Sequence, residues 1–411
     1  MEALIVSTAL DTNGQNYRYA EAARRWGADP DVLKSLVVGK YDPADVGGRF
    51  RQAATKHGGL AIRTAHMAEA YFDFPRDIRW SRSTQAEVQQ LADECDVIHL
   101  NNSEKAYIQL KMPRVRKPGI LHHHGTLFRG TYGPALMQFA RRFNIVQAVS
   151  TIDLQRRAPE ILHWLPTAYD LDALAVIAAE NRREPDGKVR VVSAPTNREI
   201  KSTALLQAAI AQLQAEGLPV ELVLIENRPW AECLAIKATA DIYFDQVKLG
   251  YGCNAIEAWG MNIPVIAGAD EWTLERMTAE FGRLPFYTAT EETIADAIRA
   301  MVQSSDLRAE WAGIGREHNE RFHAEKSALS RLAELYGLAL KWATEGPGSY
   351  ERFPSEAGLF QSVKPKLVVR IGSRTVNFVD GEAKVDDPEL AKRLRHVAMA
   401  RPGLKISEVP I

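Results

Sequence analysis

The stretch Ala240–Gly268, ADIYFDQVKLGYGCNAIEAWGMNIPVIAG, constrains the fold more than any other part of the chain. Ile242–Val247 is a short apolar run with two aromatic residues, which predicts a buried strand. Gly250-Tyr251-Gly252 allows tight turns and a close approach of the backbone to a ligand. Asn254–Met261 has the apolar spacing of a helix, and Val265–Ala267 begins another buried strand. A strand–loop–helix–strand unit of this kind directs backbone N–H groups toward an anion.

The same stretch resembles the donor-binding motif of the family 4 glycosyltransferases, which have the GT-B fold. That motif reads Glu-Gly-Phe-Gly, four further residues, then Glu-Ala. The matching residues here are Leu249, Gly250, Tyr251, Gly252, Glu257 and Ala258. Leu249 stands where the family has its first glutamate, and leucine cannot accept a hydrogen bond from a sugar hydroxyl. The resemblance implies that Gly250, Tyr251 and Gly252 contact the donor and that Glu257 binds its ribose.

Size and charge restrict the class of protein. The chain has 411 residues, enough for two ordinary domains and a small additional unit. Its formal net charge of −1 provides no overall attraction to nucleic acid or to an anionic membrane. The three cysteines, Cys95, Cys233 and Cys253, are far apart, so we expect reduced thiols and a cytoplasmic protein. We recognise neither a signal peptide before the first strand nor an apolar run of membrane-spanning length.

Strand-like and helix-like segments alternate along the first part of the chain. Ala3–Ser7 predicts a first buried strand, the loop that follows contains Gly14, and Tyr17–Trp26 has helical spacing. Such alternation favours a parallel sheet with helices on both faces and ligands near the carboxyl ends of the strands. The resemblance implies that the loop with Gly14 lies between the donor and acceptor sites. An ordinary strand–helix turn is the alternative, and such loops more often have only that role.

Three adjacent histidines, His122, His123 and His124, follow another predicted strand. Neighbouring residues of a strand point to opposite faces, so the three side chains cannot easily bind one metal ion, and we predict no metal site. The resemblance implies that His124-Gly125 lies beside the donor sugar, with Thr126 and Arg129 nearby. We take His124 as the candidate catalytic residue, because a histidine there can hydrogen bond to a sugar hydroxyl or to developing charge. A histidine with a purely structural hydrogen bond remains the alternative.

Arg198 and Lys201 lie three residues apart between the predicted strand Val189–Ser193 and the predicted helix Ala204–Gln214. A guanidinium and an ammonium beside a helix N-terminus suit a diphosphate, and the family has an arginine and a lysine in this place. A solvated pair of charges is the alternative. The loop after the next strand contains Glu226, which the resemblance places near the nucleotide base.

The resemblance also suggests how the chain is divided. We expect an N-terminal Rossmann-like domain on the acceptor side over residues 1–166 and a nucleotide-sugar-binding domain with closing helices over 167–343. Glycine and proline predict a linker over 344–365. Residues 366–411 contain short strand patterns and a helix over Pro388–Ala398, which predict a small α+β module. About 46 residues are marginal for an independent fold, so this module is expected to pack on the main body or to pair with a second copy.

The expected fold is therefore α/β, with two Rossmann-like domains facing a central cleft. The resemblance implies a retaining, metal-independent transfer of a hexose or pentose from a nucleotide-diphosphate sugar. The acceptor stays open between a protein, a glycan, a lipid and a modified nucleic acid. Gly250-x-Gly252-x-x-Ala255 followed by Asp270 also matches a dinucleotide-binding fingerprint, so an NAD-dependent oxidoreductase is an alternative. A further alternative is a GT-B relative without transfer activity, either a nucleotide-sugar epimerase or a sugar-binding protein.

Overall fold

The computed structural model describes most of the chain between residues 27 and 345 and five strands beyond it. In full, the described residues are 27–29, 32–39, 44–66, 74, 76–345, 358–362, 366–371, 374–379, 382–385, 394 and 406–409. The expected strand Ala3–Ser7, the loop with Gly14 and the helix Tyr17–Trp26 lie outside them. So does the expected helix Pro388–Ala398, apart from residue 394.

The first sheet contains seven described strands in the order β3-β2-β1-β4-β5-β6-β7, and every neighbouring pair is parallel. Every residue of β4 and β5 is buried, as expected for central strands covered on both faces. The strands are β1 (Leu33–Gly39), β2 (Leu60–His66), β3 (Ile78–Arg79), β4 (Val97–Asn101), β5 (Gly119–His123), β6 (Val146–Val149) and β7 (His163–Trp164).

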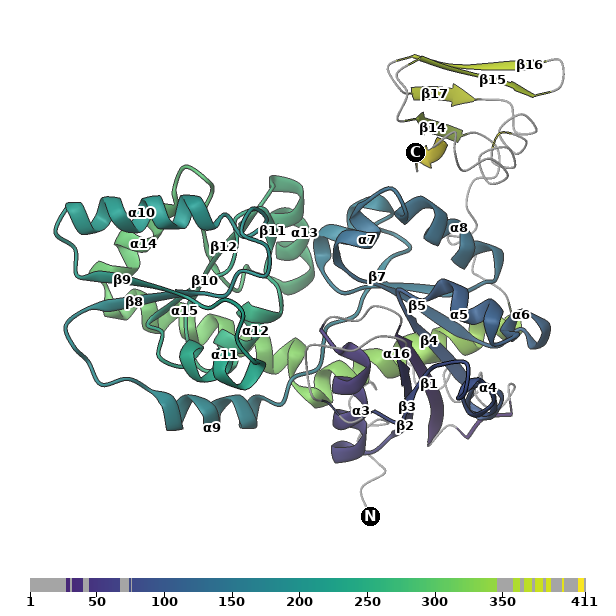
Figure 1. Cartoon of the computed structure of the whole chain (residues 1–411), viewed down its shortest axis with the longest axis horizontal. Coiled ribbons are helices and arrows are strands. Elements are labelled where there is room, and N and C mark those ends of the chain that lie inside the picture. Colours follow the sequence, from purple (N-terminus) through teal and green to yellow (C-terminus); the bar gives the residue numbers. More distant parts are fainter. Residues whose placement is uncertain are drawn as a thin grey trace.

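Helices cover both faces of this sheet (Figure 1). On one face, α3 (Val46–His57) and the long α16 (Glu325–Glu345) share a core with the sheet that includes Phe50 and Tyr336. On the other face, α4 (Gln85–Glu94), α5 (Glu104–Gln109), α6 (Met112–Val115) and α8 (Gly133–Arg142) form a second core. The chain therefore returns to its first sheet through α16 after building the second.

The second sheet has the order β11-β12-β10-β8-β9, with β13 beside β12, and only its β11–β12 pair is antiparallel among the described strands. The strands are β8 (Val189–Ser193), β9 (Val220–Leu224), β10 (Ile242–Phe244), β11 (Leu249–Gly250), β12 (Val265–Ala269) and β13 (Tyr287–Thr288). The helices are α9 (Leu171–Asn181), α10 (Thr203–Ala215), α11 (Trp230–Lys237), α12 (Cys253–Gly260), α13 (Glu271–Phe281), α14 (Ile294–Gln303) and α15 (Ser305–His318). Cores on both of its faces complete a second Rossmann-like unit.

Two chain segments connect the sheets, and they run side by side. The first follows β7, and the second is a π-helical turn, η2 (Asn319–His323), that leads into α16. The Tyr169 N–H donates to the carbonyl of His323 at 2.8 Å, and Tyr169 forms an isolated parallel bridge with Ala324. Because these segments are bonded to each other, any change in the angle between the sheets must bend both together.

The C-terminal strands form a five-stranded antiparallel sheet in the order β15-β16-β17-β14-β18. The strands are β14 (Gly358–Ser362), β15 (Lys366–Ile371), β16 (Arg374–Val379), β17 (Glu382–Val385) and β18 (Ile406–Val409). The structure corrects the linker expected over 344–365, because β14 lies within it and pairs with both β17 and β18. In this sheet β18 lies next to α8 of the main body. Among the described helices, none is long and apolar enough to cross a membrane.

Candidate functional site

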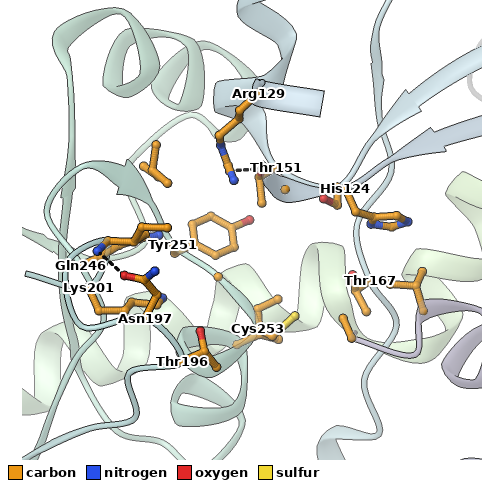
Figure 2. Close-up of a pocket in the computed structure, with 18 of the residues that line it drawn as sticks. His124, Arg129, Thr151, Thr167, Thr196, Asn197, Lys201, Gln246, Tyr251 and Cys253 are labelled. Carbon is orange, nitrogen blue, oxygen red and sulfur yellow. Dashed lines mark hydrogen bonds between the residues drawn. The ribbon is translucent and has the colours of Figure 1, made fainter. Parts of the chain in front are cut away.

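A cavity of about 320 Å³ lies between the carboxyl ends of the two parallel sheets (Figure 2). Ligands of α/β proteins bind at this edge, and the volume is at the lower end for small-molecule sites. From the first sheet and the connection after it come Ala44, Val46, Asn102, His124, Gly125, Leu127, Arg129, Ser150, Thr151 and Thr167. The rest of the lining is Thr196, Asn197, Ile200, Lys201, Gln246, Leu249, Tyr251, Gly252, Cys253, Ile256 and His323.

His124 lines the first-sheet side of the cavity, and two asparagines at the carboxyl end of β4 hold it. The side-chain oxygen of Asn102 accepts the His124 N–H at 3.0 Å, and its amide donates to the His124 carbonyl at 3.4 Å. The Asn101 Oδ1 lies 3.3 Å from His124 Nε2, which favours a proton on Nε2. Gly125 follows with φ of 51°, a conformation that suits glycine, and begins α7 (Gly125–Arg129). The structure thus fixes the backbone of His124 and leaves its side chain at the cavity.

The other two histidines of the run point elsewhere. His122 contacts His99, with 3.3 Å between His99 Nε2 and His122 Nδ1, and its ring lies 4.1 Å from that of His124. His123 faces the opposite side of the sheet and stacks on Phe128 at 3.9 Å between ring centroids. Burial lowers the pKa of His99 and His123 to about 3. The described residues contain no group of three or more potential metal ligands that could hold an ion.

Arg129 reaches the cavity from the end of α7. Its Nε and Nη2 atoms donate to the two oxygens of Asp153 at 2.6 and 3.0 Å, and Nη2 also lies 3.3 Å from the hydroxyl of Thr151. This forked ion pair fixes the plane of the guanidinium. Arg129 therefore contributes an oriented cation whose charge is largely balanced by Asp153.

On the second-sheet side, Lys201 forms an ion pair with Asp245, which directly follows β10. Asp245 is 1% exposed, and its second oxygen accepts the N–H of Gly252 at 2.7 Å. One buried carboxylate thus joins the lysine to the glycine loop at the start of α12. A Cβ atom on Gly252 would lie 3.7 Å from Lys201 Nζ, so the absence of a side chain leaves space next to the ammonium.

The backbone conformation at Gly250 favours glycine. Its φ is 79°, in the left-handed region, and a Cβ there would lie 2.3 Å from the Cε of Met277. Gly250 is not among the residues that line the cavity, whereas Tyr251 and Gly252 are. Its role in the structure is to form the turn that presents the next two residues.

Tyr251 connects the glycine loop to the segments between the sheets. Its hydroxyl lies 2.9 Å from His318 Nε2 and 3.1 Å from His323 Nε2. Since Nδ1 of His323 donates to the carbonyl of Thr167 at 3.0 Å, Nε2 of His323 accepts the Tyr251 hydroxyl proton, and His318 donates to the Tyr251 oxygen. Figure 2 shows the Tyr251 ring between the Lys201 side and the His124 side of the cavity. Its hydroxyl is an anchor, because both of its hydrogen bonds are internal.

The structure does not bring Arg198 and Glu226 into the cavity. Arg198 is exposed and donates to both oxygens of Glu226, at 2.7 and 2.5 Å. This pairing raises the pKa of Arg198 and lowers that of Glu226. The two cations diverge because residues 198–202 form turns, and α10 begins only at Thr203. The expected convergence of Arg198 and Lys201 on one anion is therefore not seen.

Glu257 is also held away from the cavity. It is 2% exposed, forms an ion pair with the buried Lys237, and accepts a hydrogen bond from Trp230 Nε1 at 3.0 Å. Both of its oxygens have partners within the protein, and Glu257 is not among the residues that line the cavity. The acid of the alternative dinucleotide fingerprint, Asp270, instead caps α13 and forms an ion pair with Arg156.

Arg49, in the helix α3 that packs on the first sheet, reaches across the cleft to Glu257. The guanidinium carbon of Arg49 lies 4.2 Å from the ring centre of Tyr169, 4.6 Å from that of Phe74 and 5.3 Å from that of Trp230. Its Nη2 is 4.0 Å from Glu257 Oε1. Arg49 is 4% exposed, so the two Rossmann-like units are joined here by a desolvated cation.

Sequence reasoning missed several residues of the cavity. Gln246 lines the cavity, and Asp245 holds Lys201 beside it. Both directly follow an apolar strand, and polar residues at that place were a usable signal. The hydroxyls of Thr151 and Thr167 and the amide of Asn197 had no distinguishing pattern. Their place depends on how the two sheets face each other.

Comparison with known proteins identifies the fold. No protein-family model matches the chain, and no curated protein matches it significantly in sequence. HepE from Anabaena, solved with UDP and glucose, superposes with a TM-score of 0.54 and 15% identity over 74% of this chain and 98% of its own. α,α-Trehalose 6-phosphate synthase from Burkholderia multivorans superposes with a TM-score of 0.53 and 11% identity, over 77% of this chain and 99% of its own. Sucrose-phosphate synthase from Thermosynechococcus elongatus superposes with a TM-score of 0.50 and 13% identity, over 74% of this chain and 98% of its own. The chain therefore has the GT-B fold, with two Rossmann-like domains facing a cleft.

Proposed function

We propose that this protein is a glycosyltransferase that moves a hexose or pentose from a nucleotide-diphosphate sugar to an acceptor, with retention and without a metal ion. One observation carries the proposal. Lys201 and the glycine loop that begins α12 line one cavity, and His124 lines the same cavity from the opposite domain. HepE, a protein of the same fold, was solved with UDP-glucose. That complex supports a uridine donor as the first to test.

The leaving diphosphate would bind between Lys201 and the amino end of α12. The phosphate would lie beside Gly252, where a Cβ atom would be 3.7 Å from the lysine ammonium. A cation and the N–H groups of a helix start stabilise negative charge that develops as the bond from the sugar to the phosphate breaks. Asp245 holds the ammonium in place from behind. These groups supply the electrophilic assistance that a metal ion supplies in other enzymes.

The groups that line the cavity limit how retention could be achieved. Among the described lining residues, none carries a carboxylate that could form a covalent sugar intermediate. The acceptor oxygen would attack the anomeric carbon on the face that the diphosphate leaves, and its proton would pass to the leaving phosphate oxygen. His124 would hydrogen bond to the sugar during this step. The acceptor would enter from the first domain, where Asn102, Ser150 and Thr151 provide polar groups.

Binding of nucleotides tests the proposal directly. A thermal-shift screen should include UDP, GDP, ADP, their sugars and NAD. A ligand at 100 times its dissociation constant adds about 2.7 kcal/mol to the free energy of unfolding, which is easily detected. Lys201→Ala should weaken binding of the stabilising nucleoside diphosphate by about tenfold or more, because a charged hydrogen bond is lost. Lys188→Ala, at the amino end of β8, is the matched control. Stabilisation by NAD alone would support the oxidoreductase and contradict the proposal.

A further inference from the structure

The loop between β10 and β11 forms one wall of the cavity, and two of its residues line it, Gln246 and Leu249. Both are tied to β12. The carbonyl of Gln246 accepts the N–H of Gly268 at 2.8 Å, and Leu249 pairs with Ala269 in the antiparallel ladder. A side chain on Gly268 would place its Cβ 1.9 Å from the carbonyl oxygen of Ala289. The wall is therefore fixed from behind by close backbone packing, and its two side chains have defined positions.

Gln246 carries a polar atom that the protein itself leaves unsatisfied. The residue is 5% exposed, and its side-chain oxygen is buried without a hydrogen-bond partner. A buried amide oxygen in this state is unfavourable, so such atoms in proteins usually have a partner. Because Gln246 lines the cavity, a ligand bound there can bring a hydrogen-bond donor to this oxygen. The ligand must bring a donor, either an O–H or an N–H group.

Leu249 favours an apolar group of the ligand over a polar one. It follows Gln246 by three residues in the same wall, and Leu127 and Ile200 add further apolar side chains to the cavity. A hydroxyl held against Leu249 would lose its hydrogen bonds to water without gaining others. A methyl group in that place would instead bury apolar surface. The wall therefore combines one hydrogen-bond acceptor with one apolar contact.

We propose that the donor sugar carries an N-acetyl amino group, which Gln246 and Leu249 recognise together. This inference rests on the proposed glycosyltransferase function and names its substrate class. The N–H of the acetamido group donates to the side-chain oxygen of Gln246, and its methyl group packs on Leu249. A sugar with only hydroxyl groups satisfies Gln246 but places a polar group on Leu249. A deoxy sugar satisfies Leu249 but brings no donor with its methyl group. An acetamido group provides both contacts in one substituent.

Calorimetric titration of the full chain with UDP, UDP-glucose, UDP-N-acetylglucosamine and UDP-N-acetylgalactosamine tests the inference. The wild type should bind one of the two acetamido donors at least tenfold more tightly than UDP-glucose. Gln246→Leu should lower the affinity for that donor by about tenfold and leave the affinity for UDP unchanged, because only the contact with the sugar is lost. Leu249→Glu should reduce the difference in affinity between the preferred acetamido donor and UDP-glucose, because a carboxylate accepts hydrogen bonds from hydroxyls. Gln90→Leu, an exposed glutamine of α4, is the matched control.

The outcomes separate the two proposals. Binding of UDP with equal affinity for UDP-glucose and both acetamido donors would overturn the acetamido inference and leave the proposed function in place. Failure to bind any of the four compounds would overturn the uridine-donor form of the proposed function, and the inference with it. Circular dichroism and thermal unfolding of each variant identify loss of folding. Gln246→Glu provides a second, polar variant, which keeps an acceptor and should retain the acetamido preference better than Gln246→Leu.

Discussion

Asp245 forms an ion pair with Lys201 from a position that is closed to solvent. The carboxylate is fully buried, whereas the Lys201 side chain is 12% exposed and borders the cavity. The same carboxylate accepts the Gly252 N–H. A buried anion thus aims a partly accessible cation at the space where an anionic ligand would bind. This arrangement predicts that the Asp245 carboxylate and a bound diphosphate both form ion pairs with the Lys201 ammonium.

Asp245→Asn should lower the free energy of unfolding by about 3 kcal/mol, because removing one partner of a buried ion pair leaves the other charge unpaired. Saturating UDP should recover part of this loss, since its diphosphate would supply a new counter-charge. The UDP-induced rise in melting temperature should therefore be larger in Asp245→Asn than in the wild type. Asp296→Asn, which removes an exposed ion pair with Arg299, is the control. A smaller UDP effect in Asp245→Asn would contradict a diphosphate site at Lys201.

Arg49 provides a second test, at the contact between the two domains. Arg49→Ala removes a desolvated cation from the faces of Tyr169 and Trp230, so we expect a loss of about 2–4 kcal/mol in unfolding free energy. It also removes the contact from α3 to Glu257, so small-angle scattering should report a larger radius of gyration. Arg316→Ala, in an exposed pair with Glu320, serves as the control. An unchanged radius of gyration would show that Arg49 does not hold the cleft closed.

The alternation of strands and helices could be predicted from the sequence because each buried strand is a short apolar run. Val189–Ser193 was predicted with its observed bounds, and Ala204–Gln214 differs from α10 by one residue at each end. The GT-B fold, expected from the resemblance, is confirmed by the structural comparison. The strand expected over Ile242–Val247 is shorter, because Asp245 turns away to bind Lys201 and Gly252. The prediction of a linker over 344–365 was wrong at β14 (Gly358–Ser362), because this strand lies among the glycine and proline positions on which the prediction rested.

The candidate site was less predictable, because the motif gives residue types but not their partners. Lys201, Tyr251, Gly252, His124 and Gly125 line one cavity. Arg198 and Glu226 neutralise each other, and Glu257 is enclosed by Lys237 and Trp230. Each of these pairings joins residues at least 20 positions apart. Sequence spacing reports which residues share a loop or a helix face, so it could not anticipate such long-range pairs.

Stability should fall in acid because several histidines are buried in the neutral form. Burial lowers the pKa of His123 to about 3, whereas an unfolded histidine titrates near 6.5. Between these values the unfolded chain binds more protons than the native one, so the free energy of unfolding decreases as the pH falls. His123→Asn removes this group and should reduce the loss between pH 6 and pH 4 by about 2 kcal/mol. Urea unfolding at a series of pH values measures it, and parallel profiles for the two proteins would refute the assignment.

Gly268 should be the glycine of β12 that cannot be replaced. A Cβ there would lie 1.9 Å from the Ala289 carbonyl oxygen, a backbone atom that cannot move without shifting β13. Gly268→Ala should therefore cost about 3 kcal/mol or more in unfolding free energy. Gly217→Ala is the informative comparison, because Gly217 has a φ of 84° but nothing within 4 Å of its Cβ position. That variant should cost only about 1 kcal/mol, from backbone strain alone. Equal losses in urea unfolding would show that β12 and β13 can separate. In that case Gln246, whose carbonyl binds the Gly268 N–H, would not be held rigidly at the cavity.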